Sequence, residues 1–173
     1  MKVFNSVLSM SALVLAVSAS IATGEAQAVT LNRSLISNSA GICQAALPAF
    51  EGLIRKRPLA VQNEGTGSAF ITCSFTSQTS PSAVTVWFHS VDGAAHSISC
   101  TGISGYYSGG NQYVPKTVAV PAAGQSSIGW SGADFTGGPA VIPGSGRFSA
   151  QCAVDPQVGI DDIQVNFSED VGT

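Results

Sequence analysis

The chain has 173 residues, of which 45% are hydrophobic and only 10% are charged, and its formal net charge is −3. This weak acidity, without clusters of Lys and Arg, argues against a nucleic-acid partner, because affinity for a phosphate backbone requires such clusters. The β-branched and aromatic residues are too frequent and too regularly patterned for a disordered chain, so a folded domain is expected.

The first 28 residues have the pattern of an export signal. A lysine at the start is followed by an uncharged apolar stretch from Val7 to Val17 and by the small-x-small sequence Ala26-Gln27-Ala28, which a signal peptidase reads. The apolar stretch is shorter than the roughly 18 residues that cross a bilayer. We therefore predict cleavage after Ala28, a single secreted or periplasmic domain over residues 29–173, and no membrane span in this mature form.

Six later segments alternate apolar and polar residues with a period of two, which is typical of strands with one face in a core and the other in water. In chain order they lie at residues 69–75, 84–89, 96–101, 114–120, 147–154 and 162–168. The fourth segment contains Pro115 and ends before Pro121, so it is expected to be an edge strand or a bulged one. Asp92-Gly93 predicts a tight hairpin between the second and third segments.

Two stretches lack this alternation. Residues 44–59 are expected to hold a single helical turn or an irregular crossover, and residues 132–146 to form a long loop. Short strands separated by Gly- and Pro-rich turns are typical of all-β domains. We predict a two-sheet antiparallel β-sandwich, with a β-barrel as the alternative.

The four cysteines, Cys43, Cys73, Cys100 and Cys152, bear on the architecture, and the last three fall on the apolar side of predicted strands. An even number of cysteines in an exported domain implies disulfides, and four cysteines allow three pairings. We favour Cys43–Cys73 with Cys100–Cys152, and the nested pairing of Cys73 with Cys100 and Cys43 with Cys152 stays open. The spacing lacks the Cys-x-x-Cys pattern of zinc sites, so no metal or other cofactor is expected.

Catalytic motifs are scarce. The two histidines, His89 and His96, lie near Asp92, but neither a Gly-x-Ser-x-Gly elbow nor a His-Glu-x-x-His motif occurs. Asp155, Asp161 and Asp162 could in principle bind calcium, but a solvated acidic edge is the favoured interpretation. We therefore predict no catalytic residues and a protein that is not an enzyme, and we keep a small secreted hydrolase as an alternative.

Aromatic residues provide the strongest indication of binding. Trp87 falls on the polar side of its strand, and Trp130 lies in a Gly-containing segment. Tyr106, Tyr107 and Tyr113 surround a Gly-rich turn. Exposed aromatic rings can stack on sugars or anchor a protein partner, although packing in the core explains Trp87 equally well. We predict a non-catalytic module that recognises a glycan or a protein partner through its loops. The other alternative is a pilin-like subunit of a surface fibre, whose edge strand a neighbour completes.

Four sequence segments also resemble a known class of proteins. AFITCSF (69–75), VTVWFH (84–89), HSISC (96–100) and RFSAQCAVDPQVGIDDIQVNFSED (147–170) are similar to small secreted proteobacterial proteins that contain four cysteines, are rich in β-structure and have no assigned activity. The usual Leu-Pro after the last cysteine is here Ala153-Val154-Asp155-Pro156. The resemblance implies an exported four-cysteine β-domain that pairs its first cysteine with the second and its third with the fourth, and it supplies no catalytic residues.

Overall fold

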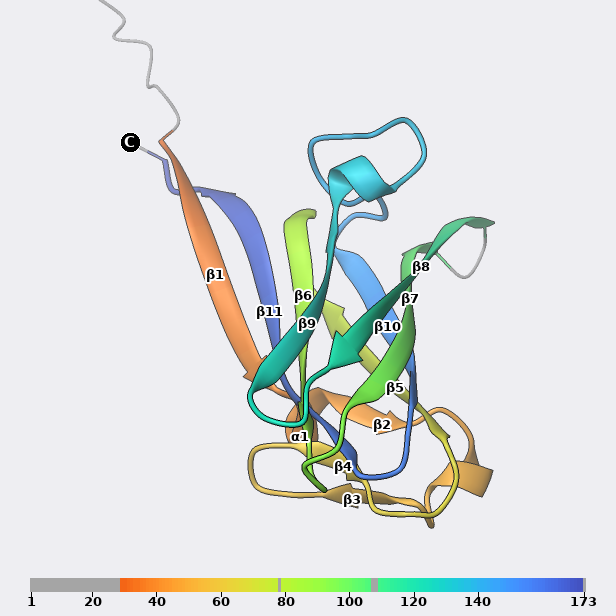
Figure 1. Ribbon diagram of the computed structural model, residues 1–173. Coiled ribbons are helices and arrows are strands. Elements are labelled where there is room, and N and C mark those ends of the chain that lie inside the picture. The colour runs from red at the N-terminus through yellow and green to blue at the C-terminus, as the bar shows by residue number, and fades with distance from the viewer. Residues whose placement is uncertain (1–28, 78, 107–108, 173) are drawn as a thin grey trace, which may run out of the picture.

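The computed structural model describes residues 29–77, 79–106 and 109–172. The chain folds into two antiparallel sheets that pack face to face without closing into a barrel (Figure 1), which confirms the predicted β-sandwich. The predicted export signal, its cleavage point and Tyr107 lie outside the described residues. Within the described ranges, no helix has the length and apolar character needed to cross a membrane.

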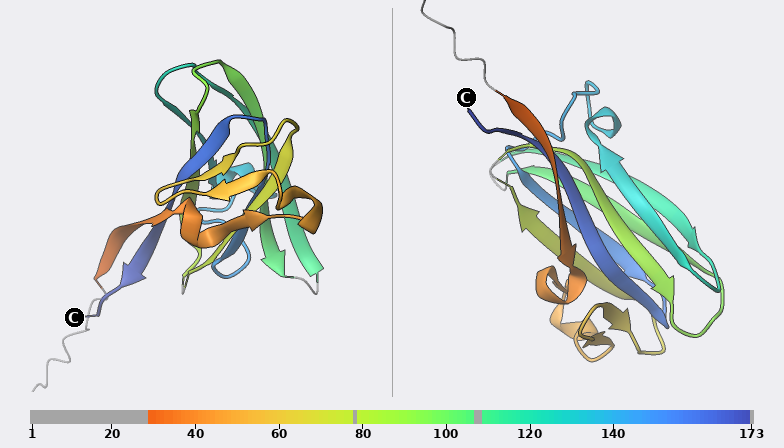
Figure 2. Two further views of the ribbon diagram at one scale, coloured as in Figure 1. Left: turned by 90° about the horizontal axis from the view of Figure 1, so that it is seen from below. Right: turned by 90° about the vertical axis from the view of Figure 1, so that its left-hand side faces the viewer.

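The first sheet, sheet A, has six strands in the order β3-β4-β11-β6-β9, and β1 also pairs with β11. These strands are β1 (Thr30–Asn38), β3 (Ile54–Lys56), β4 (Val61–Asn63), β6 (Pro81–Ser90), β9 (Gln125–Ser131) and β11 (Val158–Asp170). β1 and the end of β11 project from the sandwich as a two-stranded arm (Figures 1 and 2).

The second sheet, sheet B, has five strands in the order β2-β5-β10-β7-β8. They are β2 (Cys43–Ala45), β5 (Ala69–Thr76), β7 (His96–Tyr106), β8 (Gly109–Val120) and β10 (Arg147–Val154). β8 lies at the edge of this sheet, which confirms the prediction made from its prolines. In the described part of the chain, three short helical turns complete the fold: α1 (Ser39–Ile42), η1 (Pro48–Phe50) and η2 (Gly132–Asp134).

The prediction of a hairpin at Asp92-Gly93 is wrong. A turn forms there, but β6 pairs with β9 and β11 in sheet A, whereas β7 pairs with β8 and β10 in sheet B. Asp92 Oδ1 accepts hydrogen bonds from Ser90 Oγ and the Ala94 N–H, both at 2.9 Å, and this local turn carries the chain from one sheet to the other. An Asp-Gly sequence favours a turn but does not decide which strands pair. Here each strand buries its apolar face against the opposite sheet.

The core lies between the sheets and consists of the apolar sides of the predicted strands. Val84, Val86 and Phe88 of β6 are fully buried, as is Ile98 of β7. Trp130 of β9 reaches across to sheet B, where a Cβ on Gly102 would come within 2.6 Å of its indole nitrogen. Glycine at position 102 is therefore what leaves room for the indole ring.

Two disulfides confirm the favoured pairing, Cys43–Cys73 and Cys100–Cys152. Each bond joins neighbouring strands of sheet B, β2 to β5 and β7 to β10, rather than linking the two sheets. Two disulfides fit an extracellular or periplasmic protein, because thiols are kept reduced in the cytosol.

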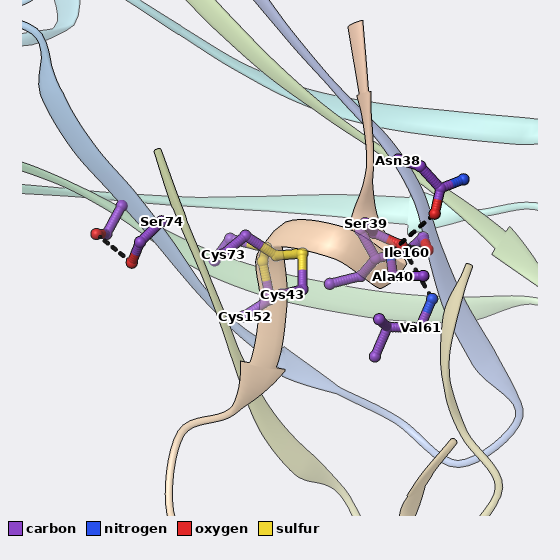
Figure 3. Close-up of a disulfide and its surroundings, with 11 residues drawn as sticks. Asn38, Ser39, Ala40, Cys43, Val61, Cys73, Ser74, Cys152 and Ile160 are labelled. Carbon is purple, nitrogen blue, oxygen red and sulfur yellow. Dashed lines mark hydrogen bonds between the residues drawn. A yellow bond between two sulfur atoms is a disulfide. The ribbon is translucent and has the colours of Figure 1, made fainter. Parts of the chain in front are cut away.

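The segment between β1 and β2 is fastened at several points (Figure 3). The Ser39 hydroxyl donates to the Ile160 carbonyl of β11 at 2.5 Å and accepts from the Val61 N–H of β4 at 2.9 Å. The Asn38 side chain caps α1 by accepting from the Ala40 N–H at 2.9 Å. The Cys43–Cys73 bond follows directly, so the chain is fixed where it leaves β1 and enters sheet B.

Candidate functional site

The structure separates the aromatic residues that were predicted to contact a ligand. Trp130 is a core residue with 1% of its surface exposed. Its ring packs against Phe148 at 5.6 Å between centroids, and its Nε1 donates to the Val114 carbonyl at 2.9 Å. The position of Trp130 corrects its proposed role, because a ring enclosed in this way has no face available to a ligand.

Tyr106 and Tyr113 lie toward one end of the β7–β8 pair in sheet B. Tyr113 is 62% exposed and Tyr106 is 37% exposed. The Arg147 guanidinium lies over the Tyr106 ring, 4.8 Å from its centroid, which occupies one face of that ring with a cation–π contact. Trp87 belongs to sheet A, so it does not form one site with Tyr106 and Tyr113.

Trp87 points away from the core on the outer face of sheet A. Its strand neighbours Val86 and Phe88 are fully buried, whereas Trp87 is half-buried. Beside it is a shallow hollow of about 200 Å³ lined by Ile36, Trp87, Gln125, Asp162 and Gln164. The hollow therefore combines one large aromatic ring with two amides, a carboxylate and an aliphatic side chain.

Four strands contribute to this hollow because of their register. Ile36 of β1 lies opposite Gln164 of β11, and Gln125 belongs to β9 on the other side of Trp87. The pairing of β11 with β6 shifts between Ile160 and Ile163. A bulge of this kind redirects side chains locally, and here it brings the Asp161-Asp162 segment alongside Trp87.

A polar network supports one side of the hollow. His89 Nδ1 lies 2.5 Å from Asp161 Oδ1, and Asp161 Oδ2 accepts from Gln125 Nε2 at 2.8 Å. On its other side, His89 Nε2 is 3.0 Å from Gln62 Nε2. The imidazole lies across Gly159, where a Cβ would overlap the ring. These contacts hold Gln125 in place through Asp161 and leave Asp162 directed to the hollow.

A second, more polar hollow lies farther along the same sheet, over β1 and β11. Asn32, Arg33, Ser34, Ser82, Asn166, Phe167 and Ser168 line it. Gln164 joins the two hollows, since its Nε2 donates to Ser34 Oγ at 2.9 Å and to Asn166 Oδ1 at 3.2 Å. Amides and hydroxyls thus continue away from Trp87 along the outer face of sheet A.

The histidines and acidic residues do not form the catalytic or calcium arrangements considered above. His96 binds Asp92 at 2.9 Å in the β6–β7 turn, whereas His89 contacts Asp161 on sheet A. Asp155 is engaged elsewhere and accepts from Ser68 Oγ at 3.0 Å. No group of three potential metal ligands was found among the residues that the structure describes.

The carboxylate of Asp92 has a strongly shifted pKa. The hydrogen bond from His96 is the main cause, with further hydrogen bonds from Ala94 and Ser90, and together they lower the pKa of Asp92 from 3.8 to about 2. This carboxylate is part of a turn at the end of the sandwich and belongs to neither hollow.

The sequence predicted only part of the hollow. Trp87, Asp162 and Gln164 fall in predicted strands, but Ile36 and Gln125 lie on strands that were not predicted. Their contribution depends on the pairing of β1 with β11 and of β9 with β6, which no short sequence motif indicates.

Comparisons with known proteins do not identify a family. No family model and no curated protein sequence matches the chain. The chain is similar to solved carbohydrate-binding modules at low identity. The C-terminal family 6 module of the marine laminarinase LamC from Zobellia galactanivorans has a TM-score of 0.46 and 10% identity, over 78% of this chain and all of that module.

Two other modules show similar values. The family 11 module from Clostridium thermocellum, solved with a β-1,3-1,4-mixed-linked tetrasaccharide, has a TM-score of 0.43 and 12% identity over 79% of this chain and 86% of that one. The family 35 module of Cellvibrio japonicus Abf62 has a TM-score of 0.43 and 13% identity over 80% and 97%. With all three TM-scores below 0.5, the assignment of the sandwich rests on the chain's own strand order.

Proposed function

We propose that the protein is a non-catalytic module that acts outside the cytoplasm and binds a neutral glycan on the outer face of sheet A. The observation that carries this proposal is the half-buried Trp87 ring beside the hollow formed with Gln125, Asp162 and Gln164. The two disulfides and the predicted export signal support the location. The proposed site is a sheet face, and not the loops that the sequence suggested.

The side chains around Trp87 match the chemistry of a sugar ring. A pyranose presents C–H groups on one face and hydroxyls at its rim, and an aromatic side chain offers a large apolar surface for the C–H groups. Amide side chains both donate and accept hydrogen bonds, and a carboxylate accepts from hydroxyls. Small hollows in which a few polar groups fix orientation are typical of small-ligand sites.

The charges on this face favour a neutral ligand. Asp161 is engaged by His89 and Gln125, which leaves Asp162 as the carboxylate that lines the hollow. No Lys or Arg lines it, so an acidic sugar would meet a negative charge with no cation to compensate it. The series of amides and hydroxyls toward Asn166 and Ser34 suits a ligand longer than one sugar unit.

The test is a screen of the purified protein on an array of neutral and acidic glycans, followed by calorimetric titration of the best ligand. Trp87→Ala should weaken binding at least about 30-fold, because central aromatic contacts contribute about 2 kcal/mol or more to binding. Trp87→Tyr should retain part of the affinity because it keeps an aromatic face.

Tyr113→Ala is the matched control, since it removes an exposed aromatic ring from the opposite sheet. It should leave the affinity unchanged, and both variants should keep the far-ultraviolet circular dichroism of the parent protein. Binding that survives Trp87→Ala and is lost in Tyr113→Ala would refute the proposed site. An array without any signal would refute the glycan itself.

A further inference from the structure

β1 exposes one complete edge. The strand pairs with β11 over all nine of its residues, without a register shift. Val29, next to β1, exchanges hydrogen bonds with Val171 and Gly172, which directly follow β11. Because bonded and non-bonded positions alternate in antiparallel pairs, the backbone groups of Thr30, Asn32, Ser34 and Ile36 point to the opposite side. No other strand among the described residues pairs with that side.

The other edges of the two sheets are shortened or covered. β2 and β3 have three residues each. β8 carries Pro115, and Lys116 covers β9 by donating from Nζ to the Gly129 carbonyl at 2.7 Å. Short strands, prolines and edge lysines are the usual means by which sheets avoid pairing with other chains. β1 has none of these features: it has nine residues and contains neither proline nor lysine.

An apolar groove opens beneath this edge, between the two sheets. It has a volume of about 340 Å³, and its apolar lining consists of Leu35, Ile42, Phe75, Val165 and Phe167. On the far side of the groove, β5 continues beyond Cys73, where its pairing with β2 stops. Leu31 and Leu35 of β1 face this side of the sheet but remain 41% and 55% exposed. The core is thus incomplete along the β1 edge.

β1 is held firmly at the end where it enters α1. Asn38 and Ser39 are hydrogen bonded, and the Cys43–Cys73 disulfide follows within a few residues. Arg33 is neutralised by Glu169, at 3.0 Å. A partner strand therefore meets an ordered, uncharged edge to which it can add, and it does not need to displace β1.

We propose that β1 is the interface through which two copies of this chain associate, each adding its β1 antiparallel to the other about a two-fold axis. Two identical strands can always pair in this way, and the two-fold axis closes the assembly at a dimer. When the pairing is centred on Ser34, the midpoint of β1, all nine residues pair. Leu35 of each copy then lies opposite Arg33 of the other and covers the open side of the groove.

The arm geometry favours this partner. β6 pairs with β11 only as far as Phe167. Beyond that residue Thr30–Asn32 of β1 and Ser168–Asp170 of β11 form an arm that projects from the body of the sandwich (Figure 2). The outer edge of β1 is therefore open to a second copy at this end of the strand. The dimer then forms one continuous sheet from two copies of sheet A.

The experiment measures the mass of the exported, processed protein by sedimentation equilibrium from about 1 μM to about 1 mM. We expect a monomer–dimer equilibrium in the micromolar range, because an interface of one strand pair is small. Leu35→Lys should weaken the dimer at least about 10-fold. Ser34→Pro should do the same, because it removes an outward N–H while proline is tolerated on an edge strand.

Leu59→Lys is the matched control, since Leu59 is 75% exposed between β3 and β4, away from the proposed interface. It should dimerise like the parent protein. Unchanged unfolding midpoints would show that all three variants fold. A monomer at every concentration, a dimer that resists both β1 variants, or open-ended filaments would each overturn the proposal. Glycan binding by the monomeric Leu35→Lys variant would show that this inference is independent of the proposed function.

Discussion

The two narrow sides of the sandwich differ in how the sheets are joined. On the side formed by β8 and β9, the closed side, side chains cross from one sheet to the other. Trp130 of β9 donates to the Val114 carbonyl of β8 at 2.9 Å, and Lys116 of β8 reaches the Gly129 carbonyl of β9 and the Asp134 carboxylate, both at 2.7 Å. These contacts link the two sheets and engage one backbone carbonyl on each of the two edge strands.

On the side formed by β1 and β5, the open side, no comparable contact between the two sheets is found among the described residues. The ion pair of Arg33 with Glu169 lies within sheet A and is about half exposed at both ends. Between the sheets lies the apolar groove. Both sides are built from extended strands, so strand formation does not close a sandwich edge by itself. The edge is closed by large or charged side chains that reach the opposite sheet.

Trp130→Ala should produce the largest change, because it removes the buried ring that closes the β8–β9 side. The loss of packing and the resulting cavity should lower the free energy of unfolding by about 3–5 kcal/mol. Denaturant unfolding followed by circular dichroism measures this change. Leu35→Ala on the open side, measured in the monomer, should cost less than about 1 kcal/mol because the side chain is already half exposed. Equal costs would contradict the comparison.

Lys116→Met should have the next largest effect. The variant keeps the aliphatic part of the side chain and removes the charged hydrogen bond to Gly129 and the ion pair with Asp134. We expect a loss of about 1–2 kcal/mol in denaturant unfolding at neutral pH. Arg33→Met is the matched control on the open side and should cost about 0.5 kcal/mol or less, because exposed ion pairs contribute little.

The cost of Lys116→Met should also depend on pH. Partial burial acts to raise the pKa of Asp134, but hydrogen bonds from Lys116 and Ser131 outweigh it and hold the pKa below its ordinary value of 3.8. A lowered pKa in the folded state adds stability above the unfolded pKa, and this stability is lost as the pH falls through the folded pKa. The difference between Lys116→Met and the parent should therefore shrink below about pH 4. A constant difference would mean that Asp134 is not involved.

The sequence predicted the strands whose apolar residues recur mainly on one side and missed those without this pattern. The predicted strands are β5, β6, β7, β8, β10 and β11, which turn apolar side chains toward the core. β1 was missed because most of its residues are exposed, and β9 because glycine and serine interrupt its pattern. Both strands are defined by their partners, and pairing between distant segments leaves no local signal.

The same limit applies to the candidate site. Alternation placed Trp87 on the outward face correctly, because the residues before and after it, Val86 and Phe88, are both apolar and point to the core. Trp130 had no such context: its predicted exposure was wrong because its burial depends on the space above Gly102 in another sheet. The residues around Trp87 were brought together by strand register, which the spacing of residues within one strand does not reveal.

Replacing Asp92 should have the smallest effect on stability. It tests whether a contact between the sheets must be buried to stabilise the fold. Like the closed side, the turn of Asp92 joins sheet A to sheet B, since the carboxylate binds His96 at the start of β7 and Ser90 at the end of β6. A titration followed by nuclear magnetic resonance should give this carboxyl a pKa of about 2, below the ordinary 3.8.

The stability that accompanies this shift is present above about pH 4 and disappears as the pH falls through about 2. Asp92→Asn keeps the acceptor for the Ala94 N–H and removes the titration, so its unfolding midpoint should match the parent closely at pH 7. Because the turn is open to solvent, its charges are screened. A loss as large as that of Lys116→Met would show that an exposed link joins the sheets as effectively as a half-buried one. The stability of the closed side would then depend on the number of its contacts rather than on their burial.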